Sequence, residues 1–120
     1  MTRYLFTLLL SSLLLNLGAC NNVDESKTES PEATRAKINA ALFRKNSCVS
    51  CHKMEGKQVG PGFKEIAEKY KDDVTAEDKL IAKITMGGEG VWGTMPMPPM
   101  SKVQPDELKI MVTYILSLAK

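Results

Sequence analysis

The sequence has few aromatic side chains and little excess charge of either sign. Aromatics make up only 6% of the 120 residues, and a single histidine, His52, is present. Sixteen basic and fourteen acidic side chains leave a net charge of +2, which is too small to indicate a nucleic-acid-binding surface. A chain of this length builds one small domain, so the large α/β enzyme folds are excluded.

No hydrophobic run reaches the length of about 20 residues that a membrane-spanning helix needs. The apolar stretch Leu5–Leu17 is shorter, contains two serines and an asparagine, and follows the basic Arg3. This pattern is typical of an export signal. The segment that closes it, Leu-Gly-Ala-Cys, resembles a bacterial lipobox. We therefore predict a lipoprotein-type signal peptide at residues 1–19 and Cys20 as the lipidation site that anchors the chain to a membrane.

Residues 21–35 contain one apolar side chain larger than alanine, Val23, among many polar ones. Such a segment cannot bury enough surface to offset its ordering entropy. We predict residues 20–35 to be the lipidated cysteine with a flexible tether, and residues 36–120 to be the folded domain. Asn21 is not the aspartate that retains enteric lipoproteins in the inner membrane, which favours the outer membrane. A plain secretory signal or an uncleaved anchor is the alternative.

The folded part carries helical periodicity in four segments and no sustained strand alternation. Capping residues, a proline at position 105 and a glycine pair after residue 86 mark several of the ends. We expect an all-α domain with helices at about 36–47, 63–70, 75–86 and 105–119. Residues 87–99 hold four glycines and three prolines and are predicted to form a long functional loop.

Cys48, Cys51 and His52 form a C-x-x-C-H run, the attachment signature of c-type haem. On a helical turn the two sulfurs point to one side, where each can add to a haem vinyl group, and the next residue offers its imidazole to the iron. A structural zinc site needs four ligands, a thioredoxin-like dithiol needs a preceding strand, and a disulfide would leave the helices little to pack on. The sequence favours haem over these three alternatives.

Beyond this signature the chain resembles the class I c-type cytochromes, and most of all the small bacterial periplasmic monohaem members. The resemblance covers about residues 41–119 and rests on LFRKNSCVSCH at 42–52, VGPGF at 59–63 and GVWGTMPMPPM at 90–100. It implies a small class I cytochrome c fold, with about four helices around one covalently bound haem c.

In that family a methionine of the glycine- and proline-rich loop is the second iron ligand. The sequence alone leaves Met86, Met95, Met97 and Met100 open, because methionine also fills core gaps. The motif match selects Met97, which lies between prolines that stiffen its backbone. Met100 stands where close relatives carry an asparagine that hydrogen-bonds the ligand sulfur, so this contact is missing here.

The resemblance implies three further haem-binding residues. The Pro61 carbonyl would accept a hydrogen bond from the ligating imidazole, and Trp92 and Lys83 would reach a haem propionate. Phe43 of the first helix is expected to cross Tyr114 or Ile115 of the last, as a structural contact.

An iron with two strong protein ligands has no open position, so it exchanges single electrons and binds no substrate. We expect an electron carrier, not an enzyme, without a small-molecule substrate, which works between a respiratory donor and a terminal oxidase or reductase. The alternatives are a haem-based sensor or low-turnover peroxidase with a dissociable Met97, and a subunit fixed within a larger complex.

Redox partner proteins are expected at an apolar patch on the haem edge, surrounded by lysines. The predicted patch consists of Val49, Ser50, Val59, Met95, Pro96 and Pro98, and the lysines are Lys45, Lys53, Lys57 and Lys102.

Overall fold

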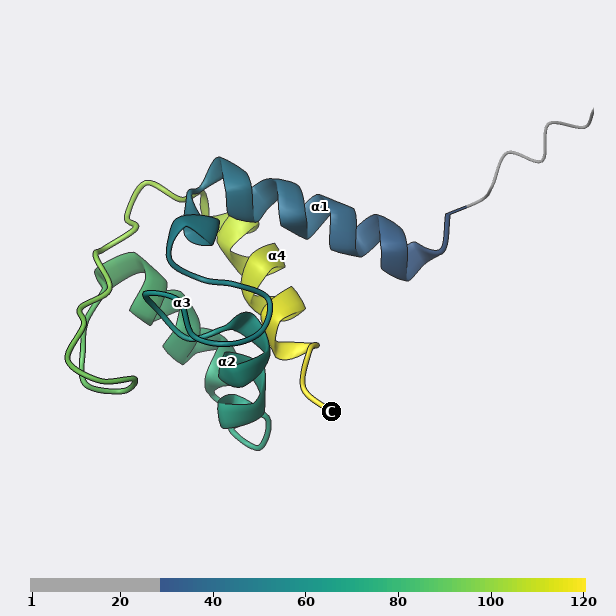
Figure 1. Cartoon of the computed structure of the whole chain (residues 1–120). Coiled ribbons are helices and arrows are strands. Elements are labelled where there is room, and N and C mark those ends of the chain that lie inside the picture. Colours follow the sequence, from purple (N-terminus) through teal and green to yellow (C-terminus); the bar gives the residue numbers. More distant parts are fainter. Residues whose placement is uncertain (1–28) are drawn as a thin grey trace, which may run out of the picture.

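The computed structural model describes residues 29–120, which fold into four α-helices. The helices are α1 (Pro31–Lys45), α2 (Phe63–Tyr70), α3 (Ala76–Met86) and α4 (Pro105–Leu116), with one 3-10 turn, η1 (Cys48–Ser50). Over this range there is no strand, so the predicted all-α class is confirmed (Figure 1). The predicted signal peptide, Cys20 and the first part of the tether lie outside the described residues. None of the described helices has the length and apolar character to cross a membrane.

Helix α1 begins earlier than the sequence analysis predicted. The Ser30 side chain accepts a hydrogen bond from the Ala33 backbone N–H at 3.2 Å, and Pro31 occupies the first turn. A serine cap followed by proline is a strong helix start, and here it outweighs the polar composition on which the tether prediction rested. The prediction that the tether runs to residue 35 is therefore wrong for residues 31–35, which are helical.

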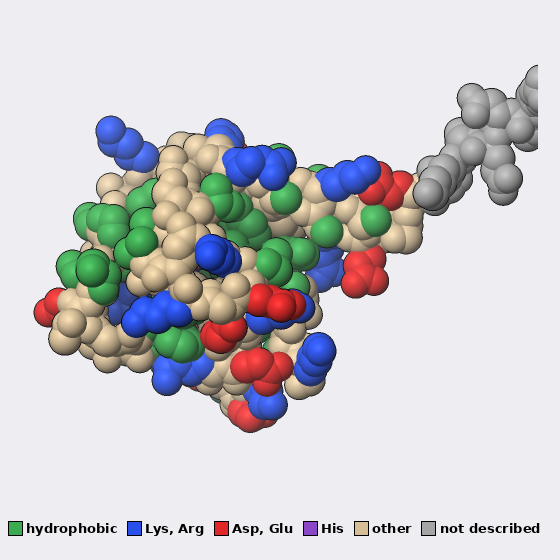
Figure 2. Space-filling view, in the orientation of Figure 1, with side chains coloured by type: hydrophobic (Ala, Val, Ile, Leu, Met, Phe, Trp, Pro, Cys, Tyr) green, Lys and Arg blue, Asp and Glu red, His purple; other side chains and the backbone are tan. Residues whose placement is uncertain are grey.

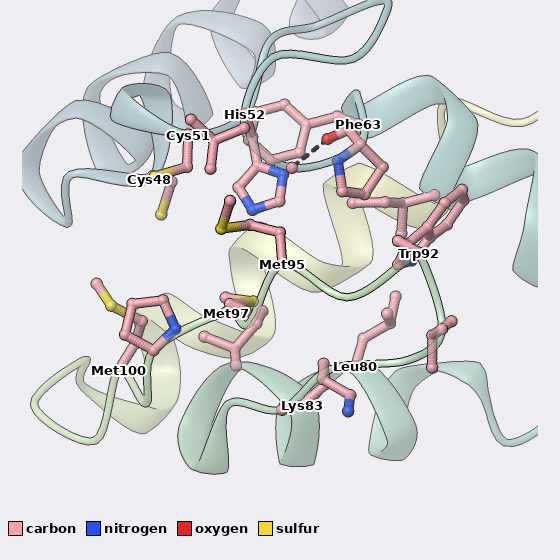
Figure 3. Close-up of a pocket in the computed structure, with 18 of the residues that line it drawn as sticks. Cys48, Cys51, His52, Phe63, Leu80, Lys83, Trp92, Met95, Met97 and Met100 are labelled. Atoms are coloured by element: carbon pink, nitrogen blue, oxygen red, sulfur yellow. Dashed lines mark hydrogen bonds between the residues drawn. The ribbon is translucent and has the colours of Figure 1, made fainter.

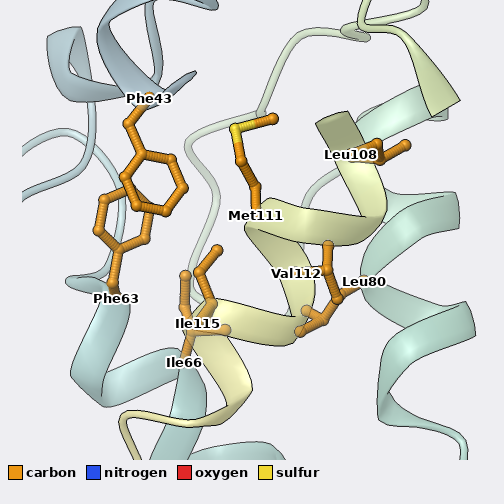
Figure 4. Close-up of a cluster of buried hydrophobic side chains, with 8 residues drawn as sticks. All are labelled: Phe43, Phe63, Ile66, Leu80, Leu108, Met111, Val112 and Ile115. Carbon is orange, nitrogen blue, oxygen red and sulfur yellow. The ribbon is translucent and has the colours of Figure 1, made fainter. Parts of the chain in front are cut away.

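Helix α4 is the central element, because α1, α2 and α3 all pack against it. Its buried side chains Leu108, Met111, Val112 and Ile115 follow the 3.6-residue period of one helix face. They meet apolar side chains from the other three helices in one core (Figure 4). The core consists of Phe43, Phe63, Ile66, Leu80, Leu108, Met111, Val112 and Ile115.

An aromatic group ties α1 to α2 and α4. The rings of Phe43 and Phe63 stack with their centroids 4.3 Å apart, and the Tyr114 ring lies 6.0 Å from that of Phe43. The predicted crossing contact between Phe43 and the last helix is confirmed. Since Phe63 directly follows the VGPG segment, the stack also fixes that segment against the core.

The segment between α3 and α4 folds back on itself at its start. Gly88 and Met97 exchange two backbone hydrogen bonds, at 3.0 and 2.9 Å. Gly87 has φ = +72°, and a Cβ there would overlap the Met97 carbonyl oxygen and the Pro98–Pro99 backbone. Only glycine fits both the conformation and the space, so the end of α3 fixes where the loop returns.

Candidate functional site

A cavity of about 170 Å³ lies between the η1 segment on one side and the loop 87–100 on the other. Side chains of α2, α3 and α4 form its base, and its lining is mainly apolar. We call it the cleft. Figure 2 shows apolar side chains gathered on this face of the molecule, with lysines near them. All the residues assigned to the haem by sequence, namely Cys48, Cys51, His52, Pro61, Lys83, Trp92 and Met97, line it.

The tight turn η1 holds the two cysteines at one end of the cleft (Figure 3). The backbone N–H groups of Cys51 and His52 both donate to the Cys48 carbonyl, at 3.2 and 3.0 Å. Both cysteines are half-buried and neither is in a disulfide. Burial raises the pKa of the Cys48 thiol, an effect to which the nearby Cys51 adds. Both thiols therefore lie in the lining of the cleft, in partly buried positions.

The His52 imidazole is held on three sides. Its Nδ1 lies 2.7 Å from the Pro61 carbonyl oxygen, which can only accept, so Nδ1 carries the proton and Nε2 keeps its lone pair. Its ring stacks on Phe63, with centroids 5.6 Å apart. A Cβ at Gly60 would overlap the ring. These contacts leave Nε2 directed into the cleft, available to bind a metal (Figure 3).

Three of the four candidate methionines, Met95, Met97 and Met100, line the opposite side of the cleft. Met86 does not line it and is 71% exposed. Met97 is half-buried and its backbone is paired with Gly88, whereas Met95 is 65% exposed. The Met100 N–H donates to the Ile84 carbonyl at 2.8 Å. Met97 and Met100 are both half-buried, both have bonded backbone N–H groups and both line the cleft, so the geometry disfavours Met86 and Met95, and the motif match chooses Met97 over Met100.

Trp92 and Lys83 lie at the end of the cleft away from the cysteines (Figure 3). A third residue joins them, since the Lys69 Nζ of α2 lies over the Trp92 ring, 5.3 Å from its centroid. The sequence analysis missed Lys69, because nothing in the local pattern of α2 shows that it meets a residue of the loop. One end of the cleft thus has sulfur and the other has cations.

These residues fit a flat, apolar cofactor with an anionic edge. The walls are apolar, the imidazole Nε2 faces inward, the sulfurs stand at one end and the cations at the other. Within residues 29–120 no three His, Cys, Asp or Glu side chains are grouped to hold a metal ion by themselves. The donor set suits an iron held in a macrocycle better than a bare zinc ion.

The predicted partner patch is divided between two places. Val59, Met95, Pro96 and Pro98 line the cleft, whereas Val49 lines a second cavity beside α1. Among the four predicted lysines, Lys53 alone lines a cavity, and it is the second one. Lys45 forms an ion pair with Glu107. Residues within and next to the C-x-x-C-H run therefore line different cavities, Cys48 and Cys51 the cleft and Val49 and Lys53 the second cavity.

Known proteins resemble this chain over nearly the whole domain. The family model "Cytochrome c" matches residues 36–119. Cytochrome c-551 of Allochromatium vinosum is 43% identical over 86 residues, which are 72% of this chain and 92% of that protein. Cytochrome c-552 of Nitrosomonas europaea is 45% identical over 83 residues, 69% of this chain and 81% of that protein.

Solved structures agree with the sequence relatives. The crystal structure of Nitrosomonas europaea cytochrome c552 superposes with a TM-score of 0.64 at 46% identity, covering 66% of this chain and 98% of that one. The class 1 cytochrome MtoD of Sideroxydans lithotrophicus gives 0.58 at 30% identity, covering 69% and 95%. The chain therefore belongs to the cytochrome c family, as a small class I member whose cofactor is one covalently bound haem c.

Proposed function

We propose that this protein carries single electrons in a bacterial respiratory chain, with a haem c held by Cys48 and Cys51 and ligated by His52 and Met97. It acts on the periplasmic side of a membrane, to which Cys20 tethers it, and it is not an enzyme. Bound haem c supplies a one-electron couple between Fe(III) and Fe(II). The observation that carries the proposal is the inward-facing Nε2 of His52, opposite a methionine-lined loop.

The proposed role of His52 rests on its fixed orientation. A metal-bound imidazole normally donates its other N–H to a fixed acceptor, and the Pro61 carbonyl lies 2.7 Å from Nδ1. This bond sets the tautomer and prevents the ring from turning away. Because the ring is already positioned, a change of iron charge requires little movement of this ligand.

The proposed role of Met97 rests on its half-buried position, on its backbone pairing with Gly88 and on the motif match. Met95 is mostly exposed to water, whereas Met100 is half-buried like Met97, so the choice between these two rests on the motif match. A thioether ligand raises the reduction potential relative to a second histidine because it favours Fe(II). With His52 and Met97 both bound to it, the iron would have no open site for oxygen, peroxide or another substrate.

The two ends of the cleft support the remaining proposed contacts of the haem. Cys48 and Cys51 would form the thioether bonds, and the Trp92 indole N–H and the Lys83 ammonium would bind the propionates at the other end. Lys83 lines the cleft from α3 and is half-buried. A cation in that position stabilises the propionate charge that an apolar cleft alone would not tolerate.

Periplasmic attachment through Cys20 is supported by the apolar N-terminal stretch and the lipobox-like segment that ends in this cysteine. Changing Cys20 to serine should release the protein from the membrane or block its processing, with an unchanged haem spectrum in any exported protein. If this variant stays membrane-bound at the wild-type mature mass, the lipoprotein assignment is wrong.

The optical spectrum of the purified protein tests the electron-carrier proposal. A six-coordinate His/Met iron gives a low-spin spectrum with a sulfur-to-iron charge-transfer band near neutral pH, and its ferrous form does not bind carbon monoxide. If carbon monoxide binds readily to the untreated ferrous protein, the iron has an open site, and a sensor or peroxidase function replaces electron transfer.

A further inference from the structure

A second cavity, of about 320 Å³, lies beside α1. We call it the α1 groove. His52, Phe43 and Phe63 line both the cleft and the α1 groove, so these three side chains separate the two cavities. The outer lining of the groove comes from α1, from η1 and from the segment that follows η1, and it includes Ala36, Ala40, Arg44, Val49, Lys53 and Met54.

The charge around the α1 groove is of one sign. Arg44 and Lys53 are exposed and line the groove, and no acidic side chain does. Neither cation is in an ion pair with any residue in the described range 29–120. The nearest acid in sequence to Lys53, Glu55, pairs with Lys64. The groove therefore combines an apolar interior with two exposed cations that are available to an external partner.

The apolar part of the groove is open to solvent. Val49 is 44% exposed and Met54 is 41% exposed, and both line the groove. Exposed apolar side chains with charges at their margin are typical of weak, transient protein contacts. Small interfaces of this kind suit electron-transfer encounters, which must form and separate quickly.

The floor of the groove leads to the proposed iron ligand through aromatic rings in contact. The His52 ring lies 5.6 Å from that of Phe63, and the Phe63 ring lies 4.3 Å from that of Phe43, each measured between centroids. A molecule in the groove would thus be separated from the cleft by the packed side chains of Phe43, Phe63 and His52. This short, packed separation favours electron exchange across it.

We propose that the α1 groove is a second docking site, which takes an acidic one-electron redox protein presenting an apolar side chain flanked by carboxylates. The inference rests on the proposed electron-carrier function and adds a surface to it. One electron leaves the reduced partner and converts the ferric iron to ferrous, and no proton or covalent bond moves. Electrons can then enter and leave the protein at different faces. One face is the α1 groove, and the other is the exposed edge of the cleft at Val59, Met95, Pro96 and Pro98, which we call the mouth of the cleft.

The experiment measures where an acidic apolar probe binds the ferrous holoprotein. The probe is a synthetic acetylated peptide amide, Asp-Glu-Leu-Leu-Glu-Asp, titrated at low ionic strength while amide chemical shifts are followed by NMR. A peptide with lysines in place of its acids serves as the control probe. We expect saturable shifts in residues 36–44 and 49–54 with the acidic probe only.

Matched charge reversals identify the site. Arg44→Glu with Lys53→Glu should weaken binding of the acidic peptide by on the order of tenfold or more, because both cations would face its carboxylates. Lys57→Glu with Lys102→Glu makes the same change in net charge on residues that line neither cavity, and it should weaken binding by only a few-fold through long-range attraction.

Three results would overturn the second docking site. They are shifts confined to the mouth of the cleft, equal weakening by the two double variants, and no saturable shift with the wild type. The low-spin spectrum and the reduction potential of every variant are recorded in parallel. If these stay normal while the groove fails to bind, electron transfer stands and the docking site is wrong, whereas an abnormal wild-type spectrum contradicts the proposed function itself.

Discussion

The cleft has two walls that are held in place by different means. We call residues 48–63 the His52 wall and residues 87–100 the methionine wall. The His52 wall is fixed by the backbone bonds within η1, by the bond from the Gly60 N–H to the Cys51 carbonyl at 2.9 Å, and by the stack on Phe63. The methionine wall has the Gly88–Met97 pair, a bond from the Gly90 N–H to the Gly93 carbonyl within the loop, and one bond from Met100 to α3, and most of its side chains are exposed. The His52 wall is joined to the core through Phe63, whereas the methionine wall is joined to the helices by few contacts.

This difference suggests that the two walls have different roles in the protein. A wall anchored in the core can present a ligand in one orientation whether or not the cofactor is bound, because its contacts are made with protein. A wall with few internal contacts gains most of its order from what fills the cleft. We therefore expect changes on the His52 wall to act on folding and assembly, and changes on the methionine wall to act on iron ligation and potential.

The largest effect is expected from the two cysteines at the base of the His52 wall. Changing both Cys48 and Cys51 to alanine removes every thioether bond, so no haem should stay covalently attached. Haem staining after denaturing electrophoresis, or extraction with acidified acetone, measures this directly. Cys20→Ser is the control and should retain full covalent staining wherever the protein is exported. Colour that remains on the double variant after extraction would contradict the assignment.

The next effect is expected on the methionine wall. Met97→Ala should open the sixth position, admit external ligands and lower the reduction potential, because a thioether favours Fe(II). The charge-transfer band near neutral pH should disappear. Met95→Leu and Met100→Leu nearly conserve volume and should keep the band. If it survives in Met97→Leu and vanishes in one of the other two, the ligand is that other methionine.

Gly60→Ala tests how rigid the His52 wall is. The added Cβ would overlap the imidazole ring, so the ring or the VGPG segment must shift. Overpacking of this kind costs about 1–3 kcal/mol, and the shift should also lengthen the bond from His52 to Pro61. Chemical denaturation of the holoprotein measures the loss, with Lys57→Ala at an exposed neighbouring position as the control. Equal stability of the two variants would show that the His52 wall accommodates the added Cβ at little cost in free energy.

The sequence predicted the His52 wall better than the methionine wall, for a physical reason. Cys48, Cys51 and His52 lie within five consecutive residues at η1 and its end, so their spacing alone carries the chemistry. The methionines share a loop without periodicity, and only the family resemblance chose among them. The contact between Lys69 and Trp92 joins distant parts of the chain, so no local pattern contains it. The Ser30–Pro31 pair is a helix-start signal in the sequence. The prediction did not use it, because the polar composition of residues 21–35 indicated a flexible tether.

A smaller effect on the reduction potential is expected from Lys69 of α2, which contacts Trp92 of the methionine wall. Its ammonium lies over the Trp92 ring at the cationic end of the cleft, where positive charge stabilises the reduced iron. Lys69→Gln should lower the reduction potential slightly and leave the charge-transfer band unchanged. Lys109→Gln removes an equally charged side chain on α4, which pairs with Glu77 instead of lying over Trp92, and it should change the potential less. Equal shifts would mean that only net charge matters.

The smallest effect is expected from a carboxylate that belongs to neither wall. Asp73 lies before α3, where it accepts hydrogen bonds from the Lys79 Nζ at 2.6 Å and from the Thr75 hydroxyl and N–H at 2.7 and 2.9 Å. First the Lys79 contact and then those from Thr75 lower its pKa from 3.8 to about 2. A pKa lower in the folded than in the unfolded state contributes stability above pH 3.8 and loses it as the pH falls toward 2.

Asp73→Asn should therefore lower the unfolding temperature slightly at neutral pH, and the difference from the wild type should shrink between about pH 4 and pH 2 as the wild-type carboxylate is protonated. Thermal unfolding of the two holoproteins across this range measures the difference, and the comparison cancels the acid effects that both proteins share. Because Asp73 lines neither the cleft nor the α1 groove, the haem spectra of the two proteins should coincide wherever both are folded. A spectral change in this variant would mean that the start of α3 is coupled to the methionine wall, which α3 precedes directly in the chain, and that this wall depends on more than the cofactor for its order.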